Sequence, residues 1–235
     1  MKAFLQLHSG LMREGPGSAD DVRWALDIAG TPLRARICDA GCGPGADAVT
    51  LAAARPAGHV HAIEQVQHFV VAARSRLSQF GARVTVEQGD MAKITGPYDL
   101  IWCAGAIYFL GVTEALNIWR RALAPGGRVA FSEPCLLGKP TPAVTAFWDE
   151  YPDITDYDGI VTRVRKAGFR VLGHRMILGV PWENYYGPMQ ARINLLRPTA
   201  NPELSVVLDE GQREIDLWHS APDQISYALS VVEPA

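Results

Sequence analysis

The sequence predicts an α/β fold, a doubly wound and mostly parallel sheet with helices on both faces. Segments typical of strands and of helices alternate from residue 35 to residue 177, which is the pattern of a parallel sheet. The strand segments are almost continuously apolar, as expected of strands covered on both faces. Three glycines at alternate positions, Gly41, Gly43 and Gly45, join the first strand to a helix. Because glycine has no Cβ, this turn predicts a site where a ligand approaches bare backbone.

The alternating elements follow one another without a long break. We expect strands at residues 35–39, 59–64, 83–87, 100–103, 128–132 and 169–177. The helix after the second strand shows apolar residues at a period of about 3.6, and it ends at Gly81. Its stripe consists of Val66, Phe69, Val70, Ala73, Leu77 and Phe80. Further helices are expected at 46–54, from Leu116 through Leu123 to a turn at 125–127, at 144–150 and at 157–167.

Two regions interrupt the alternation. The first 30 residues contain a glycine-rich loop and a short helix at 19–29, and residues 180–220 are helical and amphipathic with aromatic residues at their start. Residues 225–232 form a final strand. We therefore expect one domain, with an N-terminal lid segment (1–30), a core (31–178), a helical cap (179–220) and a last strand (221–235). Both interrupting regions should lie at the sheet edge where ligands bind.

Composition narrows the class of protein. With 235 residues, 48% hydrophobic residues and a net charge of −3, the chain has an ordinary globular core and no charge block that favours nucleic acid or a membrane surface. The four cysteines form no C-x-x-C pair, so we expect reduced thiols and no metal site. No signal-peptide pattern opens the sequence. We expect a cytoplasmic monomer or homodimer.

The glycine loop by itself leaves the cofactor open. Residues 41–46 satisfy the dinucleotide pattern G-x-G-x-x-G/A, and Glu64 lies at the spacing of its ribose-binding acid. An NAD(P)-dependent oxidoreductase is therefore one alternative.

Four features favour a different cofactor. Asp39 lies two residues before the first glycine, Gly45 follows at a spacing of two, residues 89–91 (Gly-Asp-Met) close the third strand, and residues 125–127 (Pro-Gly-Gly) precede the fifth. Together with Glu64, this ordered set resembles the class I S-adenosylmethionine-dependent methyltransferases of the small-molecule type. The resemblance runs from residue 35 to about residue 177 and includes the last strand. It implies a seven-stranded, Rossmann-like sheet whose antiparallel last strand lies beside the fifth.

The resemblance also implies the cofactor site. Glu64 would accept hydrogen bonds from both ribose hydroxyls, Asp39 would orient the loop or meet the amino group, and Asp90 would accept from the adenine amine. Arg13, in the N-terminal lid, would reach the cofactor carboxylate. The cofactor would be S-adenosyl-L-methionine, with S-adenosyl-L-homocysteine as product. The expected cofactor-binding residues are Arg13, Asp39, Gly41, Cys42, Gly43, Gly45, Glu64, Gln65, Asp90, Met91, Cys103 and Ala104.

Fewer sequence features indicate the substrate-binding and catalytic residues. Methyl transfer needs alignment of the acceptor behind the methyl group, and a base only when the acceptor is protonated. Candidate catalytic residues are His8, Glu133 and Tyr186, and candidate substrate-binding residues are Tyr108, Glu133, Trp182, Tyr185, Tyr186 and Arg192. The predicted function is methyl transfer to a small organic molecule by direct displacement. The alternatives are a non-catalytic regulator that binds S-adenosylmethionine or S-adenosylhomocysteine, and the oxidoreductase.

Overall fold

The computed structural model describes residues 2–235 and contains one mixed sheet with the strand order β3-β2-β1-β4-β5-β8-β7. The strands are β1 (Arg36–Ala40), β2 (His59–Glu64), β3 (Val84–Gln88), β4 (Tyr98–Ala104), β5 (Leu123–Leu136), β7 (Phe169–Ile177) and β8 (Ile225–Pro234). A two-residue strand, β6 (Thr155–Asp156), pairs with the end of β5. Strand β8 runs antiparallel between β5 and β7, and the other pairs are parallel. The predicted doubly wound sheet, with its antiparallel last strand beside the fifth, is confirmed.

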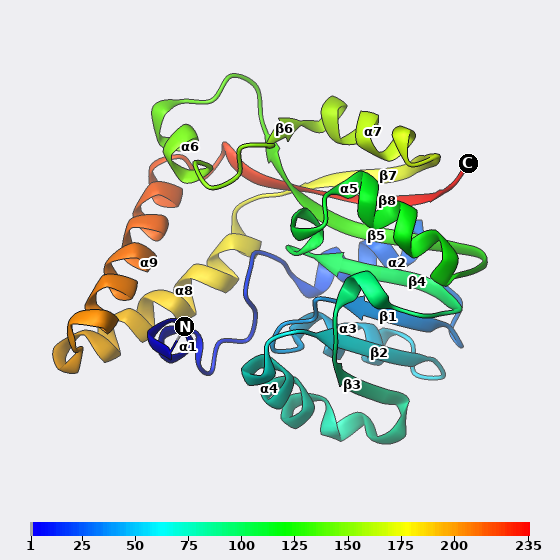
Figure 1. Ribbon diagram of the computed structural model, residues 1–235, viewed down its shortest axis with the longest axis horizontal. Helices are drawn as coiled ribbons and strands as arrows, with labels where there is room; N and C mark the ends of the chain where they lie inside the picture. The colour runs from blue at the N-terminus through cyan, green and yellow to red at the C-terminus, as the bar shows by residue number, and fades with distance from the viewer. Residues whose placement is uncertain (1) are drawn as a thin grey trace.

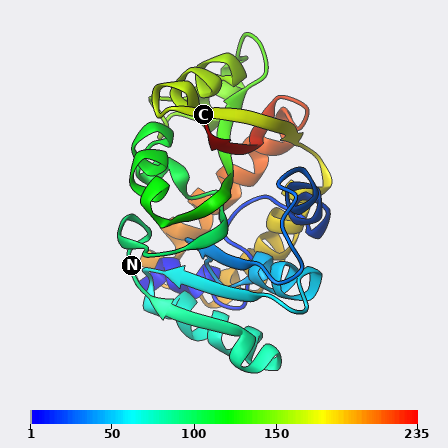
Figure 2. The ribbon, with the colours of Figure 1, turned by 90° about the vertical axis from the view of Figure 1, so that its right-hand side faces the viewer.

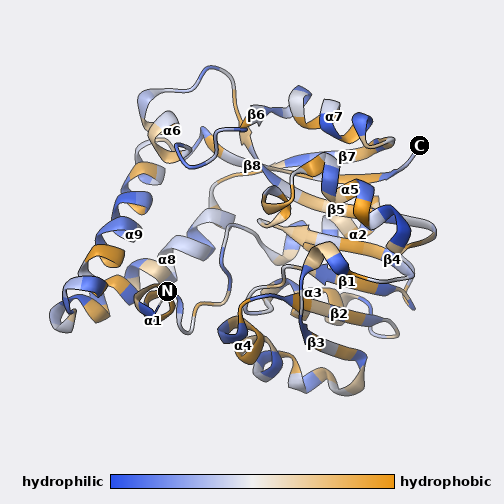
Figure 3. Cartoon of the chain, in the orientation of Figure 1, coloured by the Kyte–Doolittle hydropathy of each residue, from blue (hydrophilic) through white to orange (hydrophobic). Residues whose placement is uncertain are grey.

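Helices cover both faces of the sheet (Figure 2). On one face lie α2 (Ala19–Ile28), α3 (Ala46–Ala54) and α4 (Gln67–Leu77), and on the other α5 (Val112–Trp119) and α7 (Tyr157–Lys166). Successive strand residues point to opposite faces, so Ile37 joins the apolar layer under α2 and α3 while Cys38 joins the layer under α5. This two-sided burial explains the apolar strands, along which Figure 3 shows hydrophobic stretches in orange.

The prediction of a helix that runs to a turn at residues 125–127 is wrong. The preceding helix ends at Trp119, short of Leu123, and a 3₁₀ turn (Arg120–Ala122) leads directly into β5. Residues 125–127 lie within β5, where the pairing with β4 shifts register and Gly126 has φ +75°. A bulge in the pairing with β4 takes the place of the predicted turn.

A second group of helices packs beyond one end of the sheet (Figure 1). It consists of α1 (Lys2–His8), α6 (Pro142–Phe147), α8 (Val180–Leu196) and α9 (Pro202–Ser220). Helix α9 contacts the other three, and α1 also contacts α8. The N-terminal segment and the predicted cap therefore meet at this end, at the carboxyl ends of β1, β2 and β4.

In the part of the chain that the structure describes, no helix has the length and apolar character needed to cross a membrane. All four cysteines are buried and free of disulfides.

Candidate active site

The loop after β1 holds its shape through glycine and through hydrogen bonds to β2. Gly41 and Gly43 adopt φ +75° and +52°, a left-handed region that other residues rarely enter. A Cβ on Gly41 would lie 2.9 Å from the Cβ of Ala106. The backbone N–H groups of Gly41 and Cys42 both donate to the carbonyl oxygen of Ile63, at 2.9 and 3.0 Å. The loop is thus a preformed backbone surface at the edge of the sheet.

Glu64, the last residue of β2, fastens this loop to the start of α4. One carboxylate oxygen, Oε2, accepts the N–H of Gly43 at 2.9 Å, and the other, Oε1, accepts the N–H of Val66 at 2.7 Å. Each carboxylate oxygen has two lone pairs, so both can accept one further hydrogen bond from a ligand. The ligand role of Glu64 stays a prediction from the sequence. Sequence reasoning missed this clamp, because it depends on backbone positions that only the fold supplies.

A cavity of about 900 Å³ lies between this edge of the sheet and the second group of helices. It begins where the strand order reverses between β1 and β4, the place where open α/β sheets bind ligands. Ten of the predicted cofactor residues line it: Arg13, Asp39, Gly41, Cys42, Gly43, Glu64, Gln65, Asp90, Met91 and Ala104. It is also lined by His8, Tyr108, Trp182, Tyr185 and Tyr186. The structure brings together residues that are far apart in the sequence.

The remaining predicted site residues lie outside the cavity lining. Gly45 begins α3, and a Cβ there would press on Ala73 and Leu77 of α4, so this glycine serves helix packing. Cys103 is fully buried in the apolar layer under α5. Arg192 donates to the carbonyl oxygens of Gln6 and Leu7 and so anchors the end of α1 to α8.

Glu133 is also placed away from the cavity. It follows Ser132 on β5, and its carboxylate contacts the guanidinium of Arg163 on α7 at 3.4 Å. Its other oxygen, Oε2, is buried without a hydrogen-bond partner among residues 2–235. Burial raises the pKa of Glu133 to about 7, and Arg163 opposes the shift. Glu133 points to the α7 side of the sheet and does not line the cavity, so a substrate in the cavity would not contact it.

Asp39 has a buried carboxylate oxygen beside the cavity that a ligand could engage. It is 2% exposed, and its Oδ2 lacks a hydrogen-bond partner within the described chain. Burial raises the pKa of Asp39 well above its usual range, and the carboxylates of Asp47 and Glu64 add to the shift. A buried acceptor normally finds a donor, and an ammonium or amide N–H placed in the cavity would supply one.

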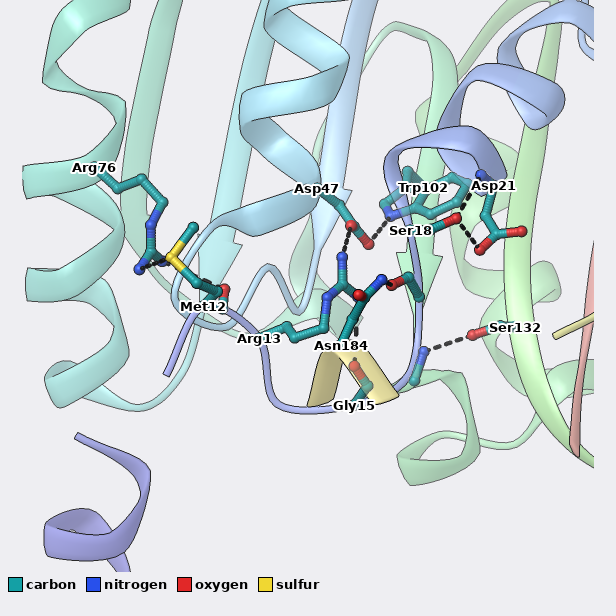
Figure 4. Close-up of polar contacts among 12 residues, drawn as sticks. Met12, Arg13, Gly15, Ser18, Asp21, Asp47, Arg76, Trp102, Ser132 and Asn184 are labelled. Atoms are coloured by element: carbon teal, nitrogen blue, oxygen red, sulfur yellow. Dashed lines mark hydrogen bonds and ion pairs between the residues drawn. The ribbon is translucent and has the colours of Figure 1, made fainter. Parts of the chain in front are cut away.

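Residues 13–16 of the N-terminal segment, here called the strap, line the cavity, and Figure 4 shows the polar contacts around them. Arg13 pairs with Asp47 on α3 at 2.8 Å, and Asp47 also accepts the indole N–H of Trp102 at 3.2 Å. Gly17 is fixed to α8, because its N–H donates to the carbonyl of Pro181 and its carbonyl accepts from Asn184, both at 3.1 Å. Arg13 therefore lies in the cavity wall with its charge already paired.

Asp90 and Met91 have contacts of their own. The Oδ1 of Asp90 accepts the N–H of Ala92 at 2.9 Å and caps a short 3₁₀ turn. The Met91 carbonyl accepts the indole N–H of Trp119 at 2.8 Å. These bonds hold the turn after β3 against the cavity, where both residues border it.

The far half of the cavity is an aromatic chamber that sequence reasoning only partly anticipated. Its rings lie 5.1–6.3 Å apart, centroid to centroid, in a continuous cluster. The cluster consists of Tyr108, Trp148, Tyr151, Trp182, Tyr186 and Tyr227. Trp148, Tyr151 and Tyr227 were missed, although the dense aromatic run at 147–151 was a signal in the sequence.

Glu214 of α9 was also missed. Its carboxylate oxygen Oε1 accepts the hydroxyl of Tyr186 at 2.7 Å, and the residue lines the cavity. Burial raises the pKa of Glu214, while the Tyr186 hydrogen bond and His8 oppose the shift. His8 itself contacts Glu14 at 2.5 Å, so acidic groups surround this end of the cavity.

No group of three or more His, Cys, Asp or Glu side chains within residues 2–235 is arranged to hold a metal ion.

Residues 34–180, which contain the glycine loop and the strands around it, match the family described as "Methyltransferase domain". The chain belongs to this family. Trans-aconitate 2-methyltransferase of Rhizobium meliloti is 34% identical to this chain over 107 residues, which are 44% of this chain and 40% of that protein. The chain spans 29–40% of the length of the curated relatives it matches.

Solved structures share the fold of this chain over all of its residues. A S-adenosylmethionine-dependent methyltransferase from Geobacter sulfurreducens, in complex with S-adenosylhomocysteine, has a TM-score of 0.86 at 19% identity, covering 100% of this chain and 98% of its own. A second, from Thiobacillus denitrificans with the same ligand, has a TM-score of 0.87 at 18% identity, covering 100% and 99%. The family match and the shared fold confirm the predicted resemblance to class I methyltransferases. They favour this family over the oxidoreductase alternative.

Proposed function

We propose that this methyltransferase binds S-adenosylmethionine in the glycine-loop half of the cavity and transfers its methyl group to a small organic molecule held in the aromatic half. One observation carries the proposal: a single cavity of about 900 Å³ joins the glycine loop to the aromatic chamber. A cavity of this size accommodates a cofactor and a small acceptor side by side. The strap, α1, α8 and α9 would act together as the lid.

The residues present fit the cofactor. The unpaired Oδ2 of Asp39 would accept from the amino group, and the free lone pairs of Glu64 would accept from the ribose hydroxyls. Asp90 would meet the adenine amine. Arg13, already paired with Asp47, would add a cation near the carboxylate. The acids of this half of the cavity also suit a cofactor that carries a positive charge on sulfur.

When bound, S-adenosylmethionine supplies a methyl group that its positive sulfur has already activated for displacement. The protein has to hold the acceptor atom in line behind that group and exclude water, and orientation of this kind supplies much of the rate. The Trp182 and Tyr227 rings, stacked at 5.4 Å, would form a rigid apolar wall for the acceptor.

Two of the three predicted proton acceptors border the cavity. Tyr186 donates its hydroxyl to Glu214, and burial raises its pKa far above the neutral range, so Tyr186 stays protonated. His8 is held by Glu14 at 2.5 Å and is the better placed of the two to take a proton from an acceptor group. We assign it that role for acceptors that arrive protonated.

Binding and turnover test the proposal separately. Saturating S-adenosylhomocysteine should raise the melting temperature, since a ligand at about 100 times its dissociation constant adds about 2.7 kcal/mol of stability. NAD and NADP should not raise it. Methylated product from a substrate panel, detected by mass spectrometry, would exclude the non-catalytic regulator. No stabilisation by S-adenosylhomocysteine, with clear stabilisation by NAD, would refute the proposal.

A further inference from the structure

The chemistry of the aromatic chamber indicates the charge of the substrate. Four carboxylates from α9 and from the α6–β6 connection line this half of the cavity: Asp149, Glu150, Glu210 and Glu214. Arg213 is the guanidinium in the same stretch of lining, and it pairs with Asp149 at 3.6 Å. The lining of this half of the cavity therefore contains more acidic than basic side chains.

Glu214 is the carboxylate best placed to meet a ligand. The Tyr186 hydroxyl is its one hydrogen-bond partner among the residues that the structure describes. Glu214 is exposed, and it is one of the residues that line the cavity. Desolvation by the surrounding protein raises the pKa of Glu214, and a positive charge beside the carboxylate would oppose that shift.

The rings beside Glu214 suit a cation as well. Tyr186 lies 5.0 Å from Tyr185 and 5.8 Å from Trp182, centroid to centroid, and all three rings line the cavity. Aromatic faces attract cations, with Trp the strongest of the side chains, and the attraction grows when the cation is desolvated. A carboxylate next to several rings is the combination that recognises ammonium groups.

An anionic substrate would find little to pair with here. Arg13 is occupied by Asp47 on the strap, and Arg213 by Asp149. His8 contacts Glu14. A carboxylate or phosphate in the chamber would face Glu214 at close range without a free guanidinium, and like charges at low dielectric repel strongly.

We propose that the substrate is an organic cation, an amine with an apolar or aromatic body, whose ammonium group pairs with Glu214 against the rings of Tyr185, Tyr186 and Trp182. This inference rests on the proposed function, because the chamber is taken to be the acceptor half of a methyltransferase site. It goes further by naming the class of acceptor molecule. The aromatic wall formed by Trp148 and Tyr227 would receive the apolar body.

A matched set of small molecules tests the class of substrate on the unaltered protein. Calorimetry on protein saturated with S-adenosylhomocysteine would compare arylalkylamines with alcohols of the same skeleton and with the corresponding carboxylic acids. The amines should bind at least tenfold more tightly than the alcohols, and the acids should not bind detectably. Selective binding of the acids or alcohols, or no binding by any amine, overturns the substrate class. Failure of S-adenosylhomocysteine to bind in the first place would instead refute the proposed function.

The variant Glu214→Gln tests the residue. Loss of one charge-assisted hydrogen bond should weaken amine binding by about tenfold or more. Affinity for S-adenosylhomocysteine should not change. Asp216→Asn, on the same helix but hydrogen-bonded to Gln212 at the surface at 3.0 Å, is the matched control and should bind amines like the original protein.

A second hypothesis is that Glu214 pairs with the positive sulfur of the cofactor, and it predicts a different result. S-adenosylmethionine carries that charge and S-adenosylhomocysteine does not. If Glu214→Gln weakened S-adenosylmethionine binding relative to S-adenosylhomocysteine and left amine binding unchanged, Glu214 would serve the cofactor and the proposal would be wrong. An unchanged ratio of the two affinities, with amine binding lost, supports it.

Discussion

Replacement of Glu64 separates the structural from the ligand-binding role of one carboxylate. Its two oxygens accept the N–H groups of Gly43 and Val66, at 2.9 and 2.7 Å. Glutamine keeps one acceptor oxygen and turns an NH₂ group toward the second N–H, which then loses its partner. A hydrogen bond to a charged group contributes about 1.5–3 kcal/mol. We therefore expect Glu64→Gln to destabilise the ligand-free protein by about this amount.

The loss should be visible in thermal unfolding. For a protein of this length, 1 kcal/mol corresponds to about 2–4 °C, so the melting temperature of Glu64→Gln should fall by about 3–12 °C. Glu64→Ala removes both acceptors and should lose roughly twice as much stability. Glu87→Gln, an exposed acid at the end of the neighbouring strand β3, is the control for loss of charge.

Calorimetry on the folded variants measures the second role. If Glu64 also accepts from the ribose hydroxyls, S-adenosylhomocysteine should bind Glu64→Ala about 10–150 times more weakly, which corresponds to about 1.5–3 kcal/mol. If Glu64→Ala lowered stability but left S-adenosylhomocysteine affinity unchanged, Glu64 would hold the loop and would not contact the ligand. A variant as stable as the original protein would refute the argument from the two backbone hydrogen bonds.

Two further predictions concern Glu133 and the cap. Because burial raises the pKa of Glu133 to about 7 from 4.5, the unfolded chain releases this proton first, and stability should fall as pH rises from about 4.5 to about 7. Denaturant titrations should show this loss of about 3 kcal/mol in the original protein but not in Glu133→Gln; parallel pH profiles would contradict it. In α8, amide exchange over residues 180–195 should slow when cofactor and substrate are both bound, since lids come from the less stable parts of a fold. Tyr186→Phe should keep S-adenosylhomocysteine affinity and impair substrate binding or turnover, whereas exchange as slow as in the central strands without ligand would make this segment core.

The sequence by itself determined the architecture and the residues that meet in the glycine-loop half of the cavity. Both follow from the order of strands, glycines and acidic residues along the chain. Parallel strands bring their carboxyl ends to one edge, so Asp39 and Glu64, each at or near the end of its strand, had to meet there. The glycine loop follows from the same order, because Gly41 and Gly43 need a conformation that other residues rarely adopt. These features require no knowledge of which helices pack against one another.

Only the tertiary structure decided which residues form the aromatic half of the cavity and which predicted candidates line it. Glu133 and Ser132 are adjacent, but side chains alternate across a strand: Ser132 accepts the N–H of Gly105 in the cavity wall, and Glu133 meets Arg163 of α7. Arg192 lies in the predicted cap, yet its orientation on α8 directs it to the carbonyls of α1. Glu214 had no distinguishing neighbours in the sequence. It lines the cavity because α9 packs against α8 and brings it to Tyr186. Local sequence patterns do not predict long-range packing of this kind.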